Sequence, residues 1–272
     1  MRAGFIGLGS QGAPMAQRII DAGVPLSLWA RRPETLEAFA GTAAVAPTPA
    51  ALAATSDVVG ICVVSDQDVE DVVLREDGVL AGSAPGTVIA IHSTVHPDTC
   101  RRIAERAAAR EVDLVDAPVS GGGIAAAEGK LLVMVGGDAE VVERVRPVFA
   151  TYGDPIIHLG DVGSGEMAKA LNNFLFTAQL TVAMETFDFA ARLGVDRAAL
   201  GQVLATGSGG SFATNVVAGS QFDVSGLAEV AASLLAKDVA IMFDLAERAG
   251  AAEPEHVAAL ARATLRMFAV GE

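Results

Sequence analysis

The sequence predicts an α/β fold in which a doubly wound parallel sheet is followed by a long helix and an all-α C-terminal domain. Short aliphatic runs alternate with helical segments up to about residue 160, and strands separated by helices form parallel sheets. After residue 163 no strand pattern remains. A run without a helix breaker extends from Gly163 to about Leu193 and would span roughly 45 Å. We therefore expect two domains, residues 1–162 and 163–272, joined by this helix.

Composition and charge exclude several classes of protein. The 272 residues suffice for two modest domains, and 51% of them are hydrophobic, mostly aliphatic. No stretch of about 18 apolar residues lacks charge, so we expect no membrane span. A formal net charge of −14 argues against a nucleic-acid surface and against binding to acidic lipids. The two cysteines, Cys62 and Cys100, offer no disulfide framework and fit a reducing compartment, and the first apolar run leads straight into a glycine-rich turn instead of a signal sequence, so we expect a cytoplasmic location. The cysteines and the four histidines have no metal-ligand spacing, so we expect no metal site.

The first expected strand, residues 2–7, runs directly into a glycine fingerprint. Its six residues, spaced G-x-G-x-x-G, are Gly7, Leu8, Gly9, Ser10, Gln11 and Gly12. Gly7 permits a tight turn, Gly9 lets the main chain approach a pyrophosphate, and Gly12 lets the following helix pack on the strand. In a chain with 29 glycines the pattern alone could be accidental. Its place between a strand and a helix predicts a dinucleotide-binding domain of the Rossmann type.

The second strand, residues 25–30, ends where such domains recognise the cofactor ribose. An NAD-selective site usually carries Asp or Glu there for the 2′-hydroxyl, whereas this chain has Ala30 followed by Arg31 and Arg32. The missing carboxylate and the two guanidinium groups favour the 2′-phosphate of NADP, with NAD as the alternative cofactor. The arginines could instead cap a surface turn before a helix expected at Pro33.

The alternation continues with strands over residues 57–64 and 87–92 and helices over 66–74 and 97–110. Both strands end in short segments with small polar groups, at the edge where a cofactor would pass. These residues are Val64 and Ser65 after the first strand, and Ser93 and Thr94 after the second. Ordinary helix caps or turns explain them equally well.

A later strand runs into Ser120, Gly121 and Gly122. This segment exposes a hydroxyl and backbone N–H groups without bulky side chains, which favours an anion cradle. A flexible glycine turn into the next strand, residues 131–137, is the alternative. A helix over 138–150 and a strand over 155–158 complete the expected first domain.

The long helical run carries two polar residues on one face. Lys169 and Asn173 stand four residues apart and therefore lie one turn from each other. A fixed ammonium beside a fixed carboxamide suits a proton donor and a group that aligns a substrate. A solvated lysine on a surface helix is the ordinary alternative. Lys237 and Asp238, taken alone, indicate a surface ion pair on a later helix.

Taken in order, these segments resemble the β-hydroxyacid dehydrogenase family, which includes 3-hydroxyisobutyrate dehydrogenases and the glyoxylate, succinic-semialdehyde and tartronate-semialdehyde reductases. Residues 7–16 are similar to its cofactor motif, 116–122 to its substrate motif and 163–173 to its catalytic motif. Lys237 and Asp238 match a further, cofactor-side element. The resemblance covers nearly the whole chain.

The resemblance implies a role for each matched residue. Lys169 would be the general acid/base, Asn173 would orient the substrate, and Lys237 would lie near the nicotinamide. Residues 120–122 would hold the carboxylate of the substrate. The implied reaction is hydride transfer between NADP, or NAD, and a small β-hydroxyacid or semialdehyde. A carbonyl that accepts hydride gains negative charge on its oxygen, which a lysine can stabilise and protonate.

The chain departs from the family pattern in several places, which leaves the substrate open. Ala125 replaces a family glycine, Lys130 stands where a small hydroxyl residue is common, and Gln11 replaces a frequent methionine. The sequence also ends at Glu272, sooner than such proteins usually do.

Two other functions remain alternatives. An imine reductase shares this architecture, but that family usually carries Asp or Tyr at the position of Lys169, and a carboxylate-free imine has no use for an anion cradle. A catalytically inert cofactor-binding scaffold is the second, and the presence of both Lys169 and Asn173 argues against it. The apolar helical domain further predicts a homodimer or homotetramer, because exposed apolar surface of that extent is rare on monomers.

Overall fold

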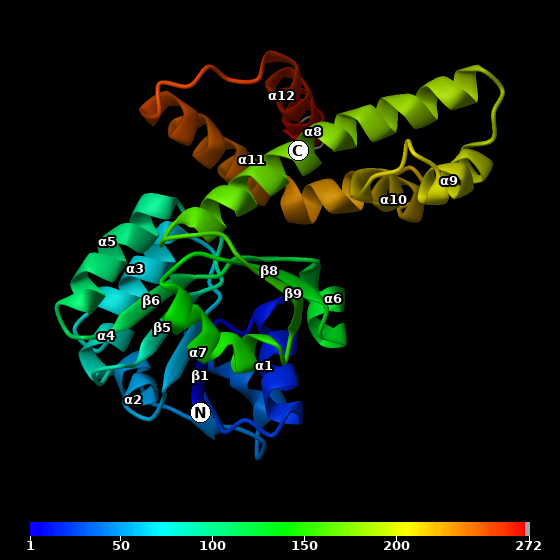
Figure 1. The fold of residues 1–272 in the computed structure, drawn as a ribbon. Helices are drawn as coiled ribbons and strands as arrows, with labels where there is room; N and C mark the ends of the chain where they lie inside the picture. The colour runs from blue at the N-terminus through cyan, green and yellow to red at the C-terminus, as the bar shows by residue number, and fades with distance from the viewer. Residues whose placement is uncertain (270–272) are drawn as a thin grey trace. The chain divides into compact units, whose positions relative to one another are not determined.

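Strands and helices alternate through the first of two units into which the computed structural model divides the chain, Met1–Lys169 and Ala170–Glu272. The structure describes residues 1–269, so the last residue, Glu272, lies outside the described part. Helix α8 (Ser164–Arg192) begins in the first unit and ends in the second (Figure 1). No helix among residues 1–269 is both long and apolar enough to cross a membrane.

The main sheet of the first unit has six strands, all parallel. In spatial order they are β3 (Ala44–Val45), β2 (Leu26–Trp29), β1 (Ala3–Ile6), β4 (Val58–Ile61), β5 (Val88–Ile91) and β6 (Asp113–Asp116). The chain builds outward from β1 to β3, then crosses over and builds outward from β4 to β6. The doubly wound sheet predicted from the sequence is thereby confirmed, and its switch point lies between β1 and β4, where such sheets bind ligands.

Helices cover both faces of this sheet (Figure 1). They are α1 (Gly12–Asp21), α2 (Pro49–Ala53), α3 (Asp66–Leu74), α4 (Val79–Gly82), α5 (Pro97–Ala108), α6 (Gly122–Glu128) and α7 (Ala139–Phe149), with a 3₁₀ helix at Pro33–Phe39. Phe5 of β1 packs in one core cluster with residues of α1 and α7, whereas its neighbour Ile6 packs in another with residues of α2, α3 and α5. Burial on both faces explains why these strands read as continuous aliphatic runs.

Three strands that follow the main sheet form a second, smaller sheet. They are β7 (Val119–Ser120), β8 (Leu131–Val135) and β9 (Gly153–His158). β7 runs antiparallel to β8, and β8 runs parallel to β9. The sequence did not predict this second sheet. β7 turns back against β8 because residues 121–130 are too short a connection for the usual parallel crossover. The helix expected at Pro33 is a 3₁₀ helix.

The second unit is all-helical, as predicted. After α8 it contains α9 (Arg197–Thr206), α10 (Phe212–Gly219), α11 (Ser225–Arg248) and α12 (Glu255–Ala269). One apolar cluster gathers around Phe187 and Leu235, and another around Phe174 and Val239. Asp196 caps α9, and Ser211 forms a reciprocal capping box at the start of α10. Polar caps thus begin helices whose apolar faces make the core.

A buried histidine joins the carboxyl end of β5 to the second sheet. His92 Nδ1 donates a hydrogen bond to the carbonyl oxygen of Ala117 at 2.7 Å, and the Tyr152 hydroxyl donates to Nε2 at 3.1 Å. The rings of Phe5 and Phe149 pack against the imidazole. Burial lowers the pKa of His92 to about 4, so the folded protein holds it neutral.

We expect this histidine to make the fold acid-sensitive. An unfolded histidine has a pKa near 6.5, so the unfolded chain binds more protons than the folded one as pH falls from about 6.5 toward the folded pKa of about 4 for His92. The stabilisation is complete above pH 6.5, and about 3 kcal/mol of the free energy of unfolding should be lost by pH 4. Urea unfolding at pH 7 and pH 5 measures the effect. His92→Gln should weaken this pH dependence of the free energy of unfolding, whereas His256→Gln, at an exposed site, should leave it unchanged. An unchanged pH dependence in His92→Gln would contradict the assignment.

Candidate active site

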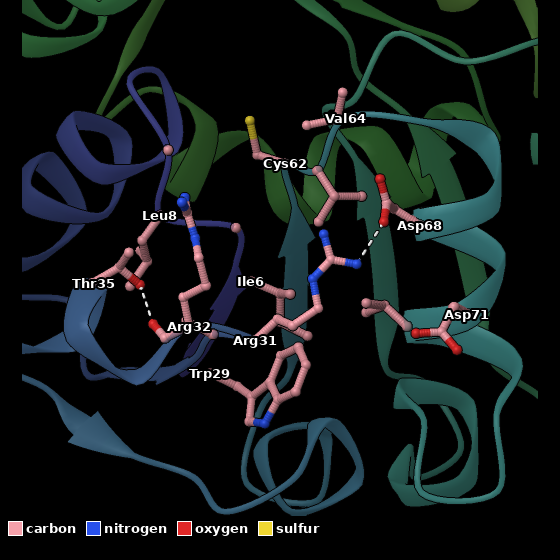
Figure 2. Close-up of a pocket in the computed structure, with 15 residues that line it drawn as sticks. Ile6, Leu8, Trp29, Arg31, Arg32, Thr35, Cys62, Val64, Asp68 and Asp71 are labelled. Atoms are coloured by element: carbon pink, nitrogen blue, oxygen red, sulfur yellow. Dashed lines mark hydrogen bonds and ion pairs between the residues drawn. The ribbon is translucent and has the colours of Figure 1, made fainter.

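A pocket lies at the carboxyl ends of β1, β2 and β4, at the switch point of the sheet (Figure 2). It holds about 670 Å³ of empty space, part of it open to solvent. Six of the residues selected from the sequence line it, namely Gly7, Leu8, Gly9, Arg31, Arg32 and Val64. Nine further residues complete the lining: Ile6, Trp29, Ala30, Thr35, Cys62, Val63, Asp68, Asp71 and Val72. The pocket therefore combines the glycine fingerprint with the basic segment after β2.

The three glycines of the fingerprint are needed for different reasons. Gly7 has φ +99°, and a Cβ atom there would lie 2.0 Å from the carbonyl oxygen of Cys62. A Cβ atom at Gly12 would lie 1.9 Å from the carbonyl oxygen of Gly7. A Cβ atom at Gly9 would meet no protein atom within 4 Å. The fold itself requires glycine at the first and last positions, whereas the middle glycine leaves main chain open beside the N-terminus of α1, where a phosphate group fits.

Replacement of Gly9 by alanine is expected to spare the fold and weaken cofactor binding. The added methyl group meets no protein atom, so the free energy of unfolding should change by less than about 1 kcal/mol. The same methyl group would hold a pyrophosphate away from the main chain, so the affinity for NADPH should fall at least about 10-fold. Trp29 lines the pocket and is the only tryptophan of the chain, so quenching of its fluorescence measures binding.

The matched control for Gly9→Ala is Gly226→Ala in α11, where an added methyl group also meets no protein atom. This control should bind NADPH as the unmodified protein does. If Gly9→Ala bound NADPH equally well, the loop would not be the pyrophosphate site.

The end of β2 places two guanidinium groups at the pocket and no carboxylate, because Ala30 follows the strand. Figure 2 shows Arg31 directed toward α3 and Arg32 on the side of Leu8. Arg31 Nη1 forms an ion pair with Asp68 Oδ1 at 2.8 Å. The Ser65 hydroxyl and Arg31 both donate to the Asp68 carboxylate, and these hydrogen bonds hold its pKa below the ordinary value.

Sequence reasoning did not select Asp68. A signal was present, since Ser65 and Asp68 have the spacing of a helix cap and its first-turn acid. Ser65 Oγ accepts the hydrogen bond of the Asp68 backbone N–H at 3.2 Å and so caps α3. Trp29, Thr35 and Asp71 were also missed; the guanidinium carbon of Arg75 lies 5.0 Å from the centre of the Trp29 ring.

Of the residues predicted at the ends of β4 and β5, some line the pocket and others are buried. Val64 lines the pocket and is 64% exposed. Ser93 is buried, and its hydroxyl oxygen accepts a hydrogen bond from the backbone N–H of Val63 at 2.8 Å. Thr94 lies between β5 and α5 and is half-buried. For Ser65 and Ser93, the cap or turn interpretation describes what their hydroxyls do in this structure, and a cofactor contact stays a prediction. Ser10 and Gln11 lie in the turn that leads into α1, and Gly12 is the first residue of that helix.

The Ser120 segment starts a helix instead of forming a long flexible turn. Ser120 ends β7, and Gly121 and Gly122 have φ values of +127° and +69°, which few other residues adopt. Helix α6 begins at Gly122, and a Cβ atom at Gly123 would lie 2.6 Å from the carbonyl oxygen of Ser10. The helix that begins in the candidate anion cradle therefore packs directly on the glycine fingerprint.

Two of the departures from the family pattern lie close to this helix. A Cβ atom at Gly121 would lie 2.6 Å from the Cβ atom of Ala125, so these positions pack closely. The ammonium group of Lys130 forms an ion pair with Glu128 at 3.1 Å, and 70% of the Lys130 side chain is exposed. Lys130 is therefore a surface residue of the first unit.

Lys169 is not a solvated surface lysine. It lies on α8, in the first unit, and is only 8% exposed. The start of α8 contacts Asp116, the last residue of β6 and the first residue of the segment that leads to Ser120. One short segment, residues 116–123, thus touches the glycine fingerprint at one end and the helix of Lys169 at the other.

Asn173 and Lys237 meet through Asp238 within the second unit. Asn173 Nδ2 donates a hydrogen bond to Asp238 Oδ2 at 2.6 Å, and Lys237 Nζ lies 3.1 Å from Asp238 Oδ1. Asp238 is only 4% exposed, so this ion pair is not the ordinary surface pair. The sequence singled out Lys237 but did not connect it with Asn173, because Asn173 and Asp238 stand 65 positions apart in the chain.

Metal and thiol chemistry find no support in the described residues. Among residues 1–269, no group of three or more His, Cys, Asp or Glu side chains could hold a metal ion. Burial raises the pKa of the Cys62 thiol to about 12, and burial is also the main cause that raises the pKa of Cys100. Neither cysteine is therefore a thiolate nucleophile near neutral pH.

Comparison with known proteins decides the family. The model described as the NAD binding domain of 6-phosphogluconate dehydrogenase matches residues 2–160. The model described as NAD-binding of NADP-dependent 3-hydroxyisobutyrate dehydrogenase matches residues 163–271. The chain belongs to the β-hydroxyacid dehydrogenase family.

Individual members of the β-hydroxyacid dehydrogenase family are similar over most of their length. The NAD-dependent L-serine dehydrogenase of Pseudomonas aeruginosa is 35% identical over 260 residues, which are 92% of this chain and 87% of that protein. The 3-hydroxyisobutyrate dehydrogenase of the same organism is 36% identical over 213 residues, 78% of this chain and 72% of that protein. The solved structure of Mycobacterium tuberculosis 3-hydroxyisobutyrate dehydrogenase with L-serine has a TM-score of 0.84 at 27% identity and covers 99% of this chain and 94% of that one. The family resemblance inferred from the motifs is thereby confirmed, and with it an NAD-binding dehydrogenase of the kind that acts on hydroxyacids.

Proposed function

We propose that this protein is an NADP-dependent oxidoreductase that transfers a hydride between the nicotinamide and a small β-hydroxyacid or semialdehyde carrying a carboxylate. The observation that carries the proposal is the packing of residues 116–123 within the first unit. Gly123 lies against the glycine fingerprint at Ser10, and Asp116 lies against the first turn of α8, which carries Lys169. The segment that carries the anion cradle thus contacts both the dinucleotide loop and the first turn of the helix that carries the buried Lys169.

The residues around the pocket fit a dinucleotide with a 2′-phosphate. Backbone N–H groups of the fingerprint would hold the pyrophosphate, and Arg31 and Arg32 would hold the 2′-phosphate beside Ala30. NAD remains the alternative cofactor, since one relative is NAD-dependent. The bound cofactor supplies the hydride in reduction and accepts it in oxidation.

Lys169 would handle the proton of the reaction. During reduction the carbonyl oxygen gains negative charge, and the lysine donates a proton to it; during oxidation the lysine takes the proton of the hydroxyl group. Its low exposure keeps bulk water from competing for that proton. Ser120, Gly121 and Gly122 would bind the carboxylate through one hydroxyl and backbone N–H groups.

For Asn173 and Lys237 we propose the roles that family membership implies. Asn173 would orient the substrate, and Lys237 would lie near the nicotinamide. Asp238 supports these roles because it accepts from the Asn173 amide and pairs with the Lys237 ammonium, which fixes both side chains.

We also propose that the protein assembles as a homodimer or homotetramer. In the second unit, Leu171, Leu175, Val182 and Phe189 of α8 are each about half exposed. Their spacing of four and seven residues places them along one stripe of the helix, as in helices that pack on a partner. Sedimentation that showed only a 27.7 kDa species would refute this assembly.

The function is tested by oxidation of NADPH and NADH with a panel of short aldehydes and keto acids. The panel should contain carboxylate-bearing semialdehydes, the matching carboxylate-free aldehydes and a cyclic imine; 3-hydroxyisobutyrate and L-serine test the reverse direction. We expect turnover with carboxylate-bearing compounds and a preference for NADPH. Tight NADPH binding without any turnover would indicate an inert cofactor-binding scaffold, and turnover of the imine alone would indicate an imine reductase.

A further inference from the structure

Asp116, at the end of β6, holds a fully buried carboxylate against the start of α8. Oδ1 accepts a hydrogen bond from the backbone N–H of Gly163 at 2.6 Å, and Oδ2 accepts one from Glu166 at 2.8 Å. A carboxylate at a helix N-terminus is stabilised by the N–H groups that have no partner inside the helix. Burial raises the pKa of Asp116, and the backbone hydrogen bonds from Gly163 and Glu166 oppose that shift.

Two glycines leave the space that this carboxylate occupies. A Cβ atom at Gly136 would lie 2.5 Å from Asp116 Oδ1, and one at Gly165 would lie 2.9 Å from Oδ2 and 2.4 Å from the carbonyl oxygen of Met134. The backbone of Asp116 also exchanges two hydrogen bonds with Gly136, of 3.0 and 2.8 Å. Side chain and main chain of Asp116 are therefore both fixed, and the start of α8 is fixed with them.

A second carboxylate ties the same helical turn to a neighbouring strand end. Glu166 is fully buried, and its Oε2 accepts a hydrogen bond from the backbone N–H of Val95 at 3.2 Å. Val95 lies just after β5, beyond Ser93 and Thr94. Lys169 follows Glu166 by three residues and so lies on the same side of the helix, about one turn further on. The position of the ammonium group thus depends on how the first turn of α8 is held.

We propose that Asp116 is a positioning residue for Lys169, because its carboxylate fixes the first turn of α8 to the end of β6. The inference rests on the proposed role of Lys169 in proton transfer. In the proposed reaction Asp116 touches neither cofactor nor substrate. It sets where the ammonium group stands relative to residues 120–122, which begin four residues further along the same segment. Misplacement of a catalytic group by about 1 Å can cost on the order of 100-fold in rate.

The test compares Asp116→Asn in two backgrounds, the unmodified chain and Lys169→Ala. Asparagine keeps the shape of the side chain, but its amide nitrogen cannot accept the second backbone N–H. In the unmodified chain kcat should fall about 10- to 100-fold, while the NADPH affinity from Trp29 quenching stays within about 3-fold. In the Lys169→Ala chain the same change should lower the residual kcat less than about 3-fold, because groups that act through one another are not additive. Asp113→Asn, at the half-buried start of β6, is the matched control and should leave kcat unchanged.

The outcomes distinguish the positioning role of Asp116 from the proton-transfer role of Lys169. Equal losses in both backgrounds, or no loss in either while Lys169→Ala is impaired, would overturn the positioning role and leave the proposed function standing. Unimpaired turnover by Lys169→Ala would instead remove the role of Lys169 itself. If Asp116→Asn fails to fold, judged by loss of a cooperative urea unfolding transition, the comparison is made with Asp116→Ser. A serine hydroxyl can accept from one backbone N–H and sets no amide donor against the other, and the same non-additive pattern is expected.

Discussion

Replacement of Lys169 by alanine is expected to lower kcat by about 10²- to 10⁴-fold, the range that general acid/base catalysis usually contributes. The expected cause is loss of the group that protonates the carbonyl oxygen and stabilises its developing charge. The affinity for NADPH, measured by Trp29 quenching, should change less than about 3-fold, because the glycine fingerprint and the arginines would bind the cofactor. Steady-state kinetics with the best substrate of the panel gives both quantities.

Lys130→Ala is the matched control for Lys169→Ala. The chain has three lysines, and Lys130 is the exposed one, paired with Glu128 at the surface of the first unit. It should keep the kcat of the unmodified protein. Lys169→Arg separates charge from proton transfer, since arginine keeps a positive charge but does not release its proton near neutral pH. A Lys169→Ala protein that turned over at the unmodified rate would show that the proton comes from elsewhere.

Replacement of Arg32 by alanine is expected to weaken NADPH binding about 10- to 100-fold, which corresponds to the 1.5–3 kcal/mol of a hydrogen bond to a charged group. NADH binding should weaken less than about 3-fold, because NADH lacks the 2′-phosphate. Adding Ala30→Asp should reverse the preference toward NADH, since a carboxylate there can accept from the 2′-hydroxyl and repels a phosphate. Fluorescence titration of Trp29 measures the affinities of both variants, with and without Ala30→Asp, for NADPH and for NADH.

The choice of Arg32 follows from the geometry of the pocket. Arg31 already pairs with Asp68 on α3, whereas Arg32 lies on the side of Leu8, and the Thr35 hydroxyl donates to its carbonyl oxygen. Arg144→Ala, which removes an exposed arginine that pairs with Asp113, controls for the loss of one positive charge. Equal weakening of NADPH and NADH by Arg32→Ala would contradict a 2′-phosphate contact.

Local sequence patterns predicted the elements whose signals are complete within a few residues. Alternating aliphatic strands and helices gave the parallel sheet, and helix α3 runs over Asp66–Leu74, the range read from the sequence. The second sheet was missed, because the reversal of direction at β7 depends on which strand it pairs with, and pairing is a tertiary choice. The glycine fingerprint was recognisable because its whole signal lies within six consecutive residues.

Contacts between distant parts of the chain were beyond local patterns. The bonds from Gly163 and Glu166 to Asp116 join residues 47 and 50 positions apart, and the bond from Asn173 to Asp238 spans 65. Nothing in the residues near Asp116 distinguishes a buried cap from an exposed acid at a strand end. The burial of Lys169 was likewise a consequence of packing that no spacing rule contains.

The carboxylate of Asp116 also limits how this protein can be cut into pieces. A fragment that stopped at residue 162 would keep Asp116 and lose Gly163 and Glu166, which donate the backbone hydrogen bonds it accepts. An interior charge deprived of its donors disfavours the native state, so such a truncation should express poorly. The nucleotide-binding domain therefore cannot be exchanged between relatives by joining the chains before α8. A chimera that folds must take the first turn of α8 from the same protein as Asp116.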